Sequence, residues 1–369
     1  MGQREGSLEA LELKSIYPQP DAKFWRGKRV WLSGHTGFKG AWMALWLVRL
    51  GAKVRGYSLA PVTNPALFEL LHLTKDLDHQ ISDIVDKNKV QQSIHDFKPE
   101  VVFHLAAQAL VRPSYLDPAL TFATNVQGTV NVLEAVRSTK TARVVVAVTT
   151  DKVYRNNENG RAFQEDDPLG GKDPYSASKS AAEMAIASYR ESFFQPDGIA
   201  LAAARAGNVI GGGDWSVDRV IPDAVRAWGN GGILTVRNPE ATRPWQHVLE
   251  PLAAYLRLAE SLFLSPRLAG DYNFGPPPHQ VSSVRDVVIQ AKQAFGSGEV
   301  RWGTKPSGPD EARTLCLENR KAEQILGVTT VWNLDQAIEK TMSWYRRQLK
   351  GEETIKLCES DFEAFLSTK

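Results

Sequence analysis

Two short groups of residues in this chain could move protons. Thr150, Asp151 and Lys152 follow one another directly after an apolar run, and Tyr175 precedes Lys179 by four positions. Residues four apart lie on the same face of a helix, so the phenol and the ammonium can face one pocket. A nearby lysine charge lowers a tyrosine pKa that is about 10 in the free side chain, so that the phenol oxygen can accept a proton. These five residues are the candidate catalytic set.

A glycine-rich turn near the start of the chain predicts a phosphate site. Residues 29–33 have the pattern of a short buried strand, and an apolar helix is expected to follow the turn. Glycines between a strand and a helix let a diphosphate approach the backbone N–H groups at the helix N-terminus. The candidate ligands in the turn are Gly34, Thr36, Gly37, Phe38 and Gly40.

Composition excludes several classes of protein. The chain has 369 residues, of which 44 are basic and 42 acidic, and this balance argues against a nucleic acid or a membrane surface as partner. Its two cysteines, Cys316 and Cys358, form neither a metal-ligand spacing nor a disulfide framework, which indicates a reducing compartment. No segment approaches the roughly 18 apolar residues of a membrane span. We therefore expect a cytoplasmic protein with no metal site.

Alternating periodicities predict the fold class. Strands are expected at 29–33, 53–58, 80–84, 101–105, 144–149 and 199–205, and helices at 38–50, 87–96, 117–138 and 175–194. Repeated strand and helix alternation is typical of an α/β fold with a doubly wound parallel sheet of Rossmann type. In such sheets ligands bind at the carboxyl ends of the strands.

The alternation stops near Asn208, where a loop-rich stretch begins. We expect an N-terminal extension over residues 1–23 and a dinucleotide-binding domain over 24–207. Residues 208–369 should form mainly a smaller C-terminal substrate-binding lobe, with some segments returning to the first domain.

Several of these stretches resemble the extended short-chain dehydrogenase/reductase family. They are the glycine turn, the strand end Leu105, Ala106 and Ala107, the Tyr175/Lys179 pair, and Arg205. More narrowly, residues 34–40, 150–154, 167–176, 205–215 and 243–248 resemble the lyases of the CDP-glucose 4,6-dehydratase group, and the resemblance covers residues 25–350. It implies tightly bound NAD, oxidation at C4 of a nucleotide-linked hexose, loss of water across C5 and C6, and return of the hydride to C6.

The resemblance also implies roles for the candidate catalytic residues. Tyr175 would take the proton of the 4-hydroxyl, Lys179 would bond the nicotinamide ribose, and Thr150 would hydrogen-bond the 4-oxygen. Asp151 would be the acid at the C6 hydroxyl and Lys152 the base at C5, in place of the glutamate of relatives that act on dTDP-glucose. Burial would raise the pKa of Asp151 and Lys152 would lower it, and a lysine is a base only when neutral. A structural ion pair between the two stays open as the alternative.

The cofactor and substrate residues follow the same resemblance. Asp83 would accept a hydrogen bond from the adenine amine. The second strand ends in Ser58 where an acid usually selects NAD, so NAD is favoured while NADP stays open, with Lys39 able to bind its extra phosphate. The candidate cofactor residues outside the glycine turn are Ser58, Asp83, Ile84, Leu105, Ala106, Ala107, Tyr175, Lys179 and Arg205. The candidate residues for the nucleotide sugar are Gln108, Asn208, Arg219 and Arg243.

Other activities and assemblies remain possible from the sequence. A nucleotide-sugar 4-epimerase would need the Tyr175/Lys179 pair but no acid and base at C5 and C6, which Asp151 and Lys152 argue against. A 4,6-dehydratase for another nucleotide hexose is disfavoured by Lys152, and a nucleotide-sensing regulator by the retained tyrosine and lysine. The family usually dimerises through helices such as 117–138 and 175–194, so a homodimer or a dimer of dimers is expected.

Overall fold

The computed structural model describes residues 19–304 and 312–368. Its centre is one sheet of seven strands in the order β11-β6-β5-β4-β1-β2-β3, and every neighbouring pair is parallel. The strands are β1 (Arg29–Ser33), β2 (Lys53–Ser58), β3 (Asp78–Ile81), β4 (Val101–His104), β5 (Val144–Val148), β6 (Ala200–Ala206) and β11 (Asp271–Phe274). This sheet confirms the predicted doubly wound Rossmann-type class.

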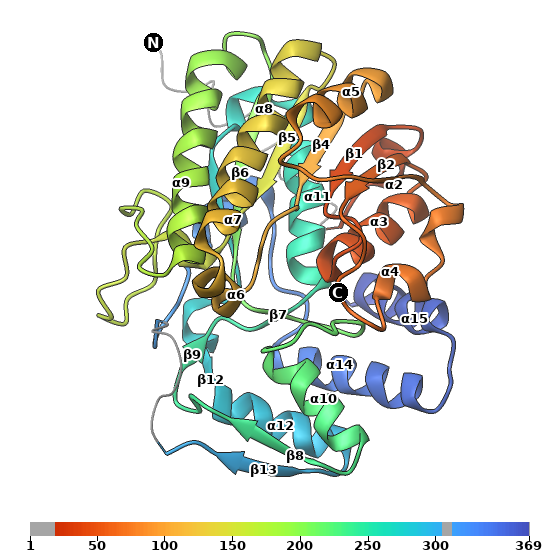
Figure 1. Ribbon diagram of the computed structural model, residues 1–369, viewed down its shortest axis with the longest axis vertical. Helices are drawn as coiled ribbons and strands as arrows, with labels where there is room; N and C mark the ends of the chain where they lie inside the picture. Colours follow the sequence, from red (N-terminus) through yellow and green to blue (C-terminus); the bar gives the residue numbers. More distant parts are fainter. Residues whose placement is uncertain (1–18, 305–311, 369) are drawn as a thin grey trace.

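Helices cover both faces of the sheet (Figure 1). Neighbouring side chains of a strand point to opposite faces: Val30 and Leu32 belong to one buried core and Trp31 to the other. Both faces of β1 are therefore apolar, as parallel sheets require. The five long helices packed on the sheet are α3 (Phe38–Arg49), α5 (Lys87–Phe97), α8 (Gly128–Thr139), α9 (Pro174–Tyr189) and α11 (Leu249–Leu264).

Two helices differ from their predicted form. The helix expected over 117–138 consists of α7 (Pro118–Phe122), a π-helical turn at Ala123–Gln127, and α8. The wide turn brings Asn125 to the end of β4, where its side-chain amide bonds the backbone N–H and carbonyl of Gln108 at 2.8 and 3.0 Å. The helix expected over 175–194 likewise ends in a π-helical turn, Arg190–Phe194. Such turns are frequent at functional sites.

A smaller lobe lies below the carboxyl ends of the strands in Figure 1. The lobe contains short two-stranded sheets, and helices pack against them. Its strands are β7 (Val209–Ile210) with β10 (Gln246–His247), β8 (Ile233–Val236) with β13 (Glu299–Trp302), and β9 (Thr242–Arg243) with β12 (Ser282–Ser283). Its helices are α10 (Val220–Gly229), α12 (Val284–Phe295) and α14 (Leu334–Leu349).

Segments from the second half of the chain pack on the sheet. Strand β11 pairs with β6, and α11 packs on the same face as α3. Helix α15 (Thr354–Ser367) lies against α3, where the ring of Phe362 is 5.3 Å from Trp42 and 5.1 Å from Trp46. The domain boundary at residue 207 remains a prediction.

The remaining elements are short. They are α2 (Ala22–Trp25), α4 (Leu67–Leu70), α6 (Val111–Leu116), α13 (Arg320–Leu326) and 3-10 turns at Leu73–Lys75, Asp151–Val153, Pro266–Leu268 and Pro278–Gln280. Within the described part of the chain, no helix has the length and apolar character needed to cross a bilayer. Among the same residues, no cluster of three or more His, Cys, Asp or Glu side chains could hold a metal ion.

Candidate active site

The glycine turn packs closely against the end of β4. Gly34 has a φ of +77°, and a Cβ there would lie 2.8 Å from the backbone nitrogen of Ala106. A Cβ on Gly40 would lie 2.0 Å from the carbonyl oxygen of Gly34. Both positions therefore exclude a side chain, whatever the ligand.

Gly37 has a different part in the turn. It is the N-cap of α3, no side chain caps the helix there, and a Cβ on it would meet only the Gly34 oxygen, at 3.4 Å. The open space beside Gly37 and the first N–H groups of α3 form a cradle that a diphosphate fits. Phe38, the next residue, packs its ring toward Gly211. These features fit the predicted dinucleotide.

A pair of hydroxyls joins the turn to the end of β2. Thr36 Oγ1 donates to the Leu59 carbonyl at 2.8 Å and lies 2.8 Å from Ser58 Oγ. Since Thr36 has a single hydroxyl proton, Ser58 is the donor within the pair. The Ser58 oxygen keeps acceptor capacity for a ligand hydroxyl such as that of a ribose.

The loop after β3 carries the predicted adenine contact. Asp83 is exposed, and its Oδ1 accepts from the Val85 N–H at 2.9 Å. Ile84 is buried, and its carbonyl accepts from Asn131 Nδ2 at 3.1 Å. The loop is thus anchored to α8, with the Asp83 side chain at the surface.

The end of β4 is held by Ser33. Its Oγ accepts from the N–H groups of Leu105 and Ala106 at 3.0 and 3.1 Å. Leu105, Ala106 and Ala107 are half-buried, as expected for backbone that a ligand approaches. Gln108 differs from the prediction, since its carboxamide bonds the backbone N–H and carbonyl of Leu110 and the Thr121 hydroxyl. That side chain shapes the loop, so a sugar contact would need it to turn.

The candidate catalytic residues come together between β5 and α9. Thr150 caps a 3-10 turn that contains Asp151 and Lys152, and its Oγ1 donates to Asp151 Oδ1 at 2.9 Å. Tyr175 lies in the first turn of α9, where its backbone N–H donates to Ser114 Oγ at 3.1 Å. A side-chain hydrogen bond joins Tyr175 to Thr150.

Burial dominates the ionisation of the tyrosine and lysine pair. Burial raises the pKa of Tyr175 to about 12, although the hydrogen bond with Thr150 opposes it. Burial also lowers the pKa of Lys179 to about 8, against the charge of Glu183. Lys179 Nζ donates to the Val148 carbonyl at 3.1 Å. The expectation that Lys179 lowers the pKa of Tyr175 is therefore not met in the protein alone, because desolvation outweighs it.

Asp151 has the character required of an acid. It is 2% exposed, and burial raises its pKa although Lys152, Thr150, Arg243 and Lys39 all act to lower it. Within the described residues its Oδ2 has no hydrogen-bond partner. A buried oxygen of this kind fits a protonated carboxyl that donates to a ligand.

Lys39 lies near the candidate catalytic residues. Its Nζ lies 5.9 Å from the ring centroid of Tyr255, and it interacts electrostatically with Arg219, Lys179 and Asp151. Burial lowers the pKa of Lys39 to about 8. The suggestion that Lys39 binds the extra phosphate of NADP is therefore wrong for this side-chain position, which faces the catalytic residues.

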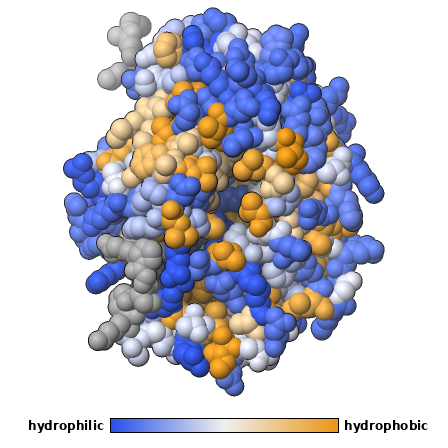
Figure 2. Space-filling view, in the orientation of Figure 1, coloured by the Kyte–Doolittle hydropathy of each residue, from blue (hydrophilic) through white to orange (hydrophobic). Residues whose placement is uncertain are grey.

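Two of the predicted substrate residues, Arg219 and Arg243, lie near the candidate catalytic residues. Arg243 is buried, and Nη1 donates to the Thr242 carbonyl at 2.8 Å. Arg219 Nη1 is 3.0 Å from Asp214 Oδ2, and its charge acts on both Lys39 and Tyr175. Asn208 is half-buried. Figure 2 shows the surface hollowed near the centre of this face, between the sheet and the lobe.

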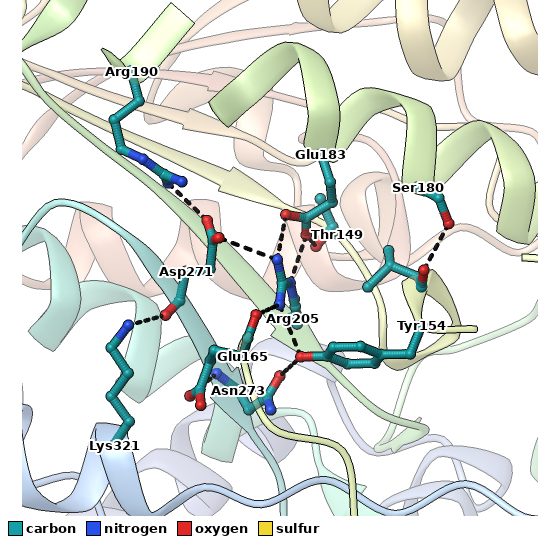
Figure 3. A network of polar contacts seen from close by, with 11 residues as sticks. Thr149, Tyr154, Glu165, Ser180, Glu183, Arg190, Arg205, Asp271, Asn273 and Lys321 are labelled. Atoms are coloured by element: carbon teal, nitrogen blue, oxygen red, sulfur yellow. Dashed lines mark hydrogen bonds and ion pairs between the residues drawn. The ribbon is translucent and has the colours of Figure 1, made fainter. Parts of the chain in front are cut away.

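Arg205 occupies a different environment from the predicted cofactor contact. Its guanidinium is 2% exposed and bonds Glu183 through Nε at 3.0 Å and Nη2 at 2.9 Å (Figure 3). Nη1 donates to the Tyr154 hydroxyl at 2.9 Å and the Glu165 carbonyl at 2.8 Å. This placement does not support direct contact with a cofactor, because every guanidinium nitrogen already bonds the protein.

Two residues near the site were missed from the sequence. Tyr255 of α11 is fully buried, its hydroxyl has no hydrogen-bond partner among the described residues, and its pKa is raised by burial and by Tyr175 and Asp151. An aromatic residue in an apolar helix gave no functional signal. Glu183 could have been found, since it lies four residues after Lys179 on the same helix face.

Comparisons with known proteins identify the family of the chain. Residues 32–341 match the sequence model of the family described as GDP-mannose 4,6 dehydratase. The chain is 42% identical over 353 residues to a CDP-glucose 4,6-dehydratase of Salmonella typhimurium, covering 94% of this chain and 98% of the relative.

Solved structures share the fold. A UDP-glucose 4-epimerase of Thermus thermophilus, in complex with NAD, is 27% identical with a TM-score of 0.72, covering 86% of this chain and 99% of that one. A dTDP-glucose 4,6-dehydratase of Bacillus anthracis, in complex with NAD, has a TM-score of 0.74 at 20% identity, covering 88% and 98% of the two chains. The chain therefore belongs to the GDP-mannose 4,6-dehydratase family, within the extended short-chain dehydrogenases/reductases.

Proposed function

We propose that this protein is a nucleotide-sugar 4,6-dehydratase that converts CDP-glucose to CDP-4-keto-6-deoxyglucose and water. The observation that carries the proposal is the buried Asp151, adjacent to Lys152 and close to the Tyr175 and Thr150 pair, in a chain 42% identical to a CDP-glucose 4,6-dehydratase. An epimerase would need the tyrosine but has no elimination for an acid and a base to assist.

NAD is the proposed cofactor, and when bound it would accept a hydride from C4 of the sugar and return it to C6. The cradle at Gly37 would hold its diphosphate, and Ser58 would bond a ribose hydroxyl. Lys39 lies near the catalytic residues, so it is not placed to bind the extra phosphate of NADP beside Ser58. This favours NAD over NADP.

Tyr175 and Thr150 would handle the 4-hydroxyl. A phenol whose pKa is raised to about 12 by burial is almost fully protonated near neutral pH, so formation of the phenolate base must be assisted by nearby positive charge. The charge of Arg219 acts in that direction, and we propose that Lys179, one turn further along α9, adds to it. Thr150 bonds Tyr175 and would hold the sugar oxygen beside it.

Asp151 and Lys152 would carry out the elimination. A carbonyl at C4 acidifies the C5 hydrogen, which neutral Lys152 would remove, while protonated Asp151 would donate to the departing C6 hydroxyl. The raised pKa of Asp151 supports the acid role. Hydroxide is a poor leaving group unless it is protonated, so this proton is needed for water to depart.

Arginines and lysines would bind the diphosphate of the substrate. Arg243 and Lys39 act on Asp151, and Arg219 acts on Lys39 and Tyr175, so these cations border one pocket. Guanidinium groups suit phosphate oxygens because they bond two at once. Asn208 is proposed to add a neutral contact.

Incubation of the purified protein with CDP-glucose, dTDP-glucose, UDP-glucose and GDP-mannose tests the reaction. Dehydration gives a 4-keto-6-deoxy product with a characteristic absorbance in alkali, and we expect it with CDP-glucose. A CDP-hexose epimer without the keto product would instead identify an epimerase. The mass of the nucleotide released on denaturation would distinguish NAD from NADP.

Assembly and location complete the proposal. Large apolar side chains are exposed on the helices around α9, and Figure 2 shows pale and orange side chains gathered over α7 and α9 at the left of the view. The exposed large apolar residues of these helices are Tyr115, Leu116, Leu120, Phe122, Met184 and Phe193. We propose that this face forms a homodimer, which could pair into a dimer of dimers. Two free cysteines accord with a cytoplasmic location.

A further inference from the structure

Figure 3 shows a buried network around Arg205 that joins α9 to the sheet. Glu183 and Arg205 form a two-pronged ion pair, and their side chains are 1% and 2% exposed. Arg205 also lies 3.2 Å from Asp271 Oδ2 on β11, and Asp271 Oδ1 accepts from Arg190 at 2.7 Å. Two arginines thus face two carboxylates, so the network is electrically balanced.

The pair holds both ends of the candidate catalytic segment. Thr149, directly before Thr150, donates its hydroxyl to Glu183 Oε1. Tyr154, two residues after Lys152, accepts from Arg205 Nη1 at 2.9 Å and donates to Asn273 Oδ1 at 2.6 Å. The strand end and the residue after the 3-10 turn are therefore tied to one ion pair.

The same ion pair is part of the helix that carries Tyr175 and Lys179. Glu183 follows Lys179 by four residues and Tyr175 by eight, so the three side chains share one face of α9. A shift of α9 along the sheet would move the phenol relative to Thr150 and would also break the Glu183 bonds to Thr149 and Arg205.

We propose that Arg205 and Glu183 are positioning residues that fix Tyr175 against Thr150 and keep Lys179 positively charged. The inference rests on the proposed dehydratase function, since its readouts are steps of that reaction. Arg205 acts by holding in place the segment that begins at Thr149 and ends at Tyr154. Glu183 acts in the same way and also through its negative charge.

The charges around Lys179 determine the direction in which its pKa would shift if the charge of Glu183 were lost. Lys39 on α3 repels it and Glu183 on its own helix attracts it, while burial keeps His104 on β4 neutral. Asp151 and Tyr175 lie in the adjoining pocket, and Arg205 is bonded to Glu183. The pKa of Lys179 is about 8, and the charge of Glu183 opposes further lowering. Loss of that charge therefore deprotonates Lys179 at a lower pH.

Three variants distinguish the positioning of Tyr175 from the effect of charge on Lys179. They are Glu183→Gln, Glu183→Asp and Arg205→Lys. The rate at which CDP-glucose reduces the bound nicotinamide would be measured in a single turnover from pH 6 to 9, with the substrate KM from steady state. Glu183→Gln should lower the rate on the order of 100-fold, because small misplacements of reacting groups have effects of that size. Its fall in rate at high pH should begin at lower pH than in wild type, with KM changed by less than about threefold.

The two conservative variants should show the loss of positioning without the loss of charge. Glu183→Asp keeps the charge and should restore the wild-type pH profile at a reduced rate. Arg205→Lys loses the two-pronged bond and should lower the rate with little change in KM. Glu260→Gln is the matched control, because Glu260 is a carboxylate 3% exposed and paired with Arg257 at 2.5 Å, outside this network. It should leave both the rate and the profile unchanged.

Several outcomes would overturn the inference. A wild-type pH profile in Glu183→Gln would show that Glu183 does not keep Lys179 charged. An increased KM with an unchanged rate would show that Glu183 does not position Tyr175. If Glu183→Gln does not fold, Arg205→Lys and Glu183→Asp still decide, because wild-type rates in both exclude positioning. Wild-type protein that turns over no nucleotide sugar would instead contradict the proposed function, on which this inference rests.

Discussion

Thr150 Oγ1 donates a hydrogen bond to Asp151 Oδ1 at 2.9 Å, which leaves Asp151 Oδ2 as the buried oxygen without a partner within the described chain. The bond from Thr150 favours the carboxylate, whereas burial of the unpaired oxygen favours the protonated form. The direction of the pKa shift agrees, since burial raises it against four lowering contacts. In the proposed reaction, Oδ2 would carry the proton that Asp151 gives to the sugar.

Asp151→Asn should block elimination and leave oxidation intact. Without the acid, the rate of water loss should fall by roughly 100- to 10,000-fold. The bound nicotinamide should then stay reduced after mixing with CDP-glucose, and the keto intermediate should accumulate. Asp166→Asn, at an exposed position, is the control. In wild type the acid form is lost as pH rises through the raised pKa of Asp151, so elimination should slow toward high pH.

Lys152→Ala should stop exchange of the C5 hydrogen with deuterated solvent, because no base remains at that carbon. Lys152→Arg keeps a positive charge beside Asp151 but has no neutral form to act as base. Both variants should therefore lose exchange, measured by mass spectrometry of the sugar. Exchange retained in Lys152→Arg would mean that Lys152 forms only an ion pair.

Gly37→Ala should weaken cofactor binding without unfolding the protein. The φ of Gly37 is −77°, which alanine adopts, and its Cβ would point into the proposed diphosphate cradle. We expect NAD affinity to fall at least about tenfold, with a stability change within about 0.5 kcal/mol. Gly229→Ala, at an exposed helix end, is the control and should bind NAD normally. Equal affinity in both variants would place the diphosphate elsewhere.

Charges introduced on the apolar face beside α9 should dissociate the proposed dimer. Leu116 is 87% exposed and Met184 59% exposed, so glutamate at either position should not disturb the fold. Sedimentation should show a shift toward monomer for Leu116→Glu and Met184→Glu. Leu264→Glu, at a residue 71% exposed on α11, should leave the assembly unchanged. A wild-type protein that sediments as a monomer would contradict this surface assignment.

Asp361→Asn should stabilise the protein at alkaline pH. Burial raises the pKa of Asp361 to about 7 from 3.8, and its Oδ2 lies 4.0 Å from His247 Nε2. A carboxyl with a raised folded-state pKa destabilises the fold once it ionises, so the cost appears as pH rises from about 4 to 7 and is constant above 7. The variant should gain about 2 to 4 kcal/mol at pH 8 and little at pH 4, measured by urea unfolding. A gain equal at both pH values would indicate a packing effect.

The strand and helix pattern of the sheet could be read from the sequence because it is local. Apolar runs at 29–33, 101–105 and 144–149 correspond to β1, β4 and β5 within one or two residues. Parallel strands placed side by side then bring Gly34 and Thr150 to the same edge of the sheet. The predicted strand at 80–84 lies instead at Asp78–Ile81, since its weak alternation did not define its ends.

The sequence by itself determined the fold class, the glycine turn and the residue types able to carry out the proposed chemistry, because spacing along a strand or helix decides these. Only the tertiary structure decided where the long side chains go. Arg205 turned out to bond Glu183, Lys39 turned inward, and Tyr255 reached the pocket from α11. Burial also set the ionisation of Tyr175 and Asp151. Desolvation and ion pairing depend on residues distant in the chain, so no local pattern contains them.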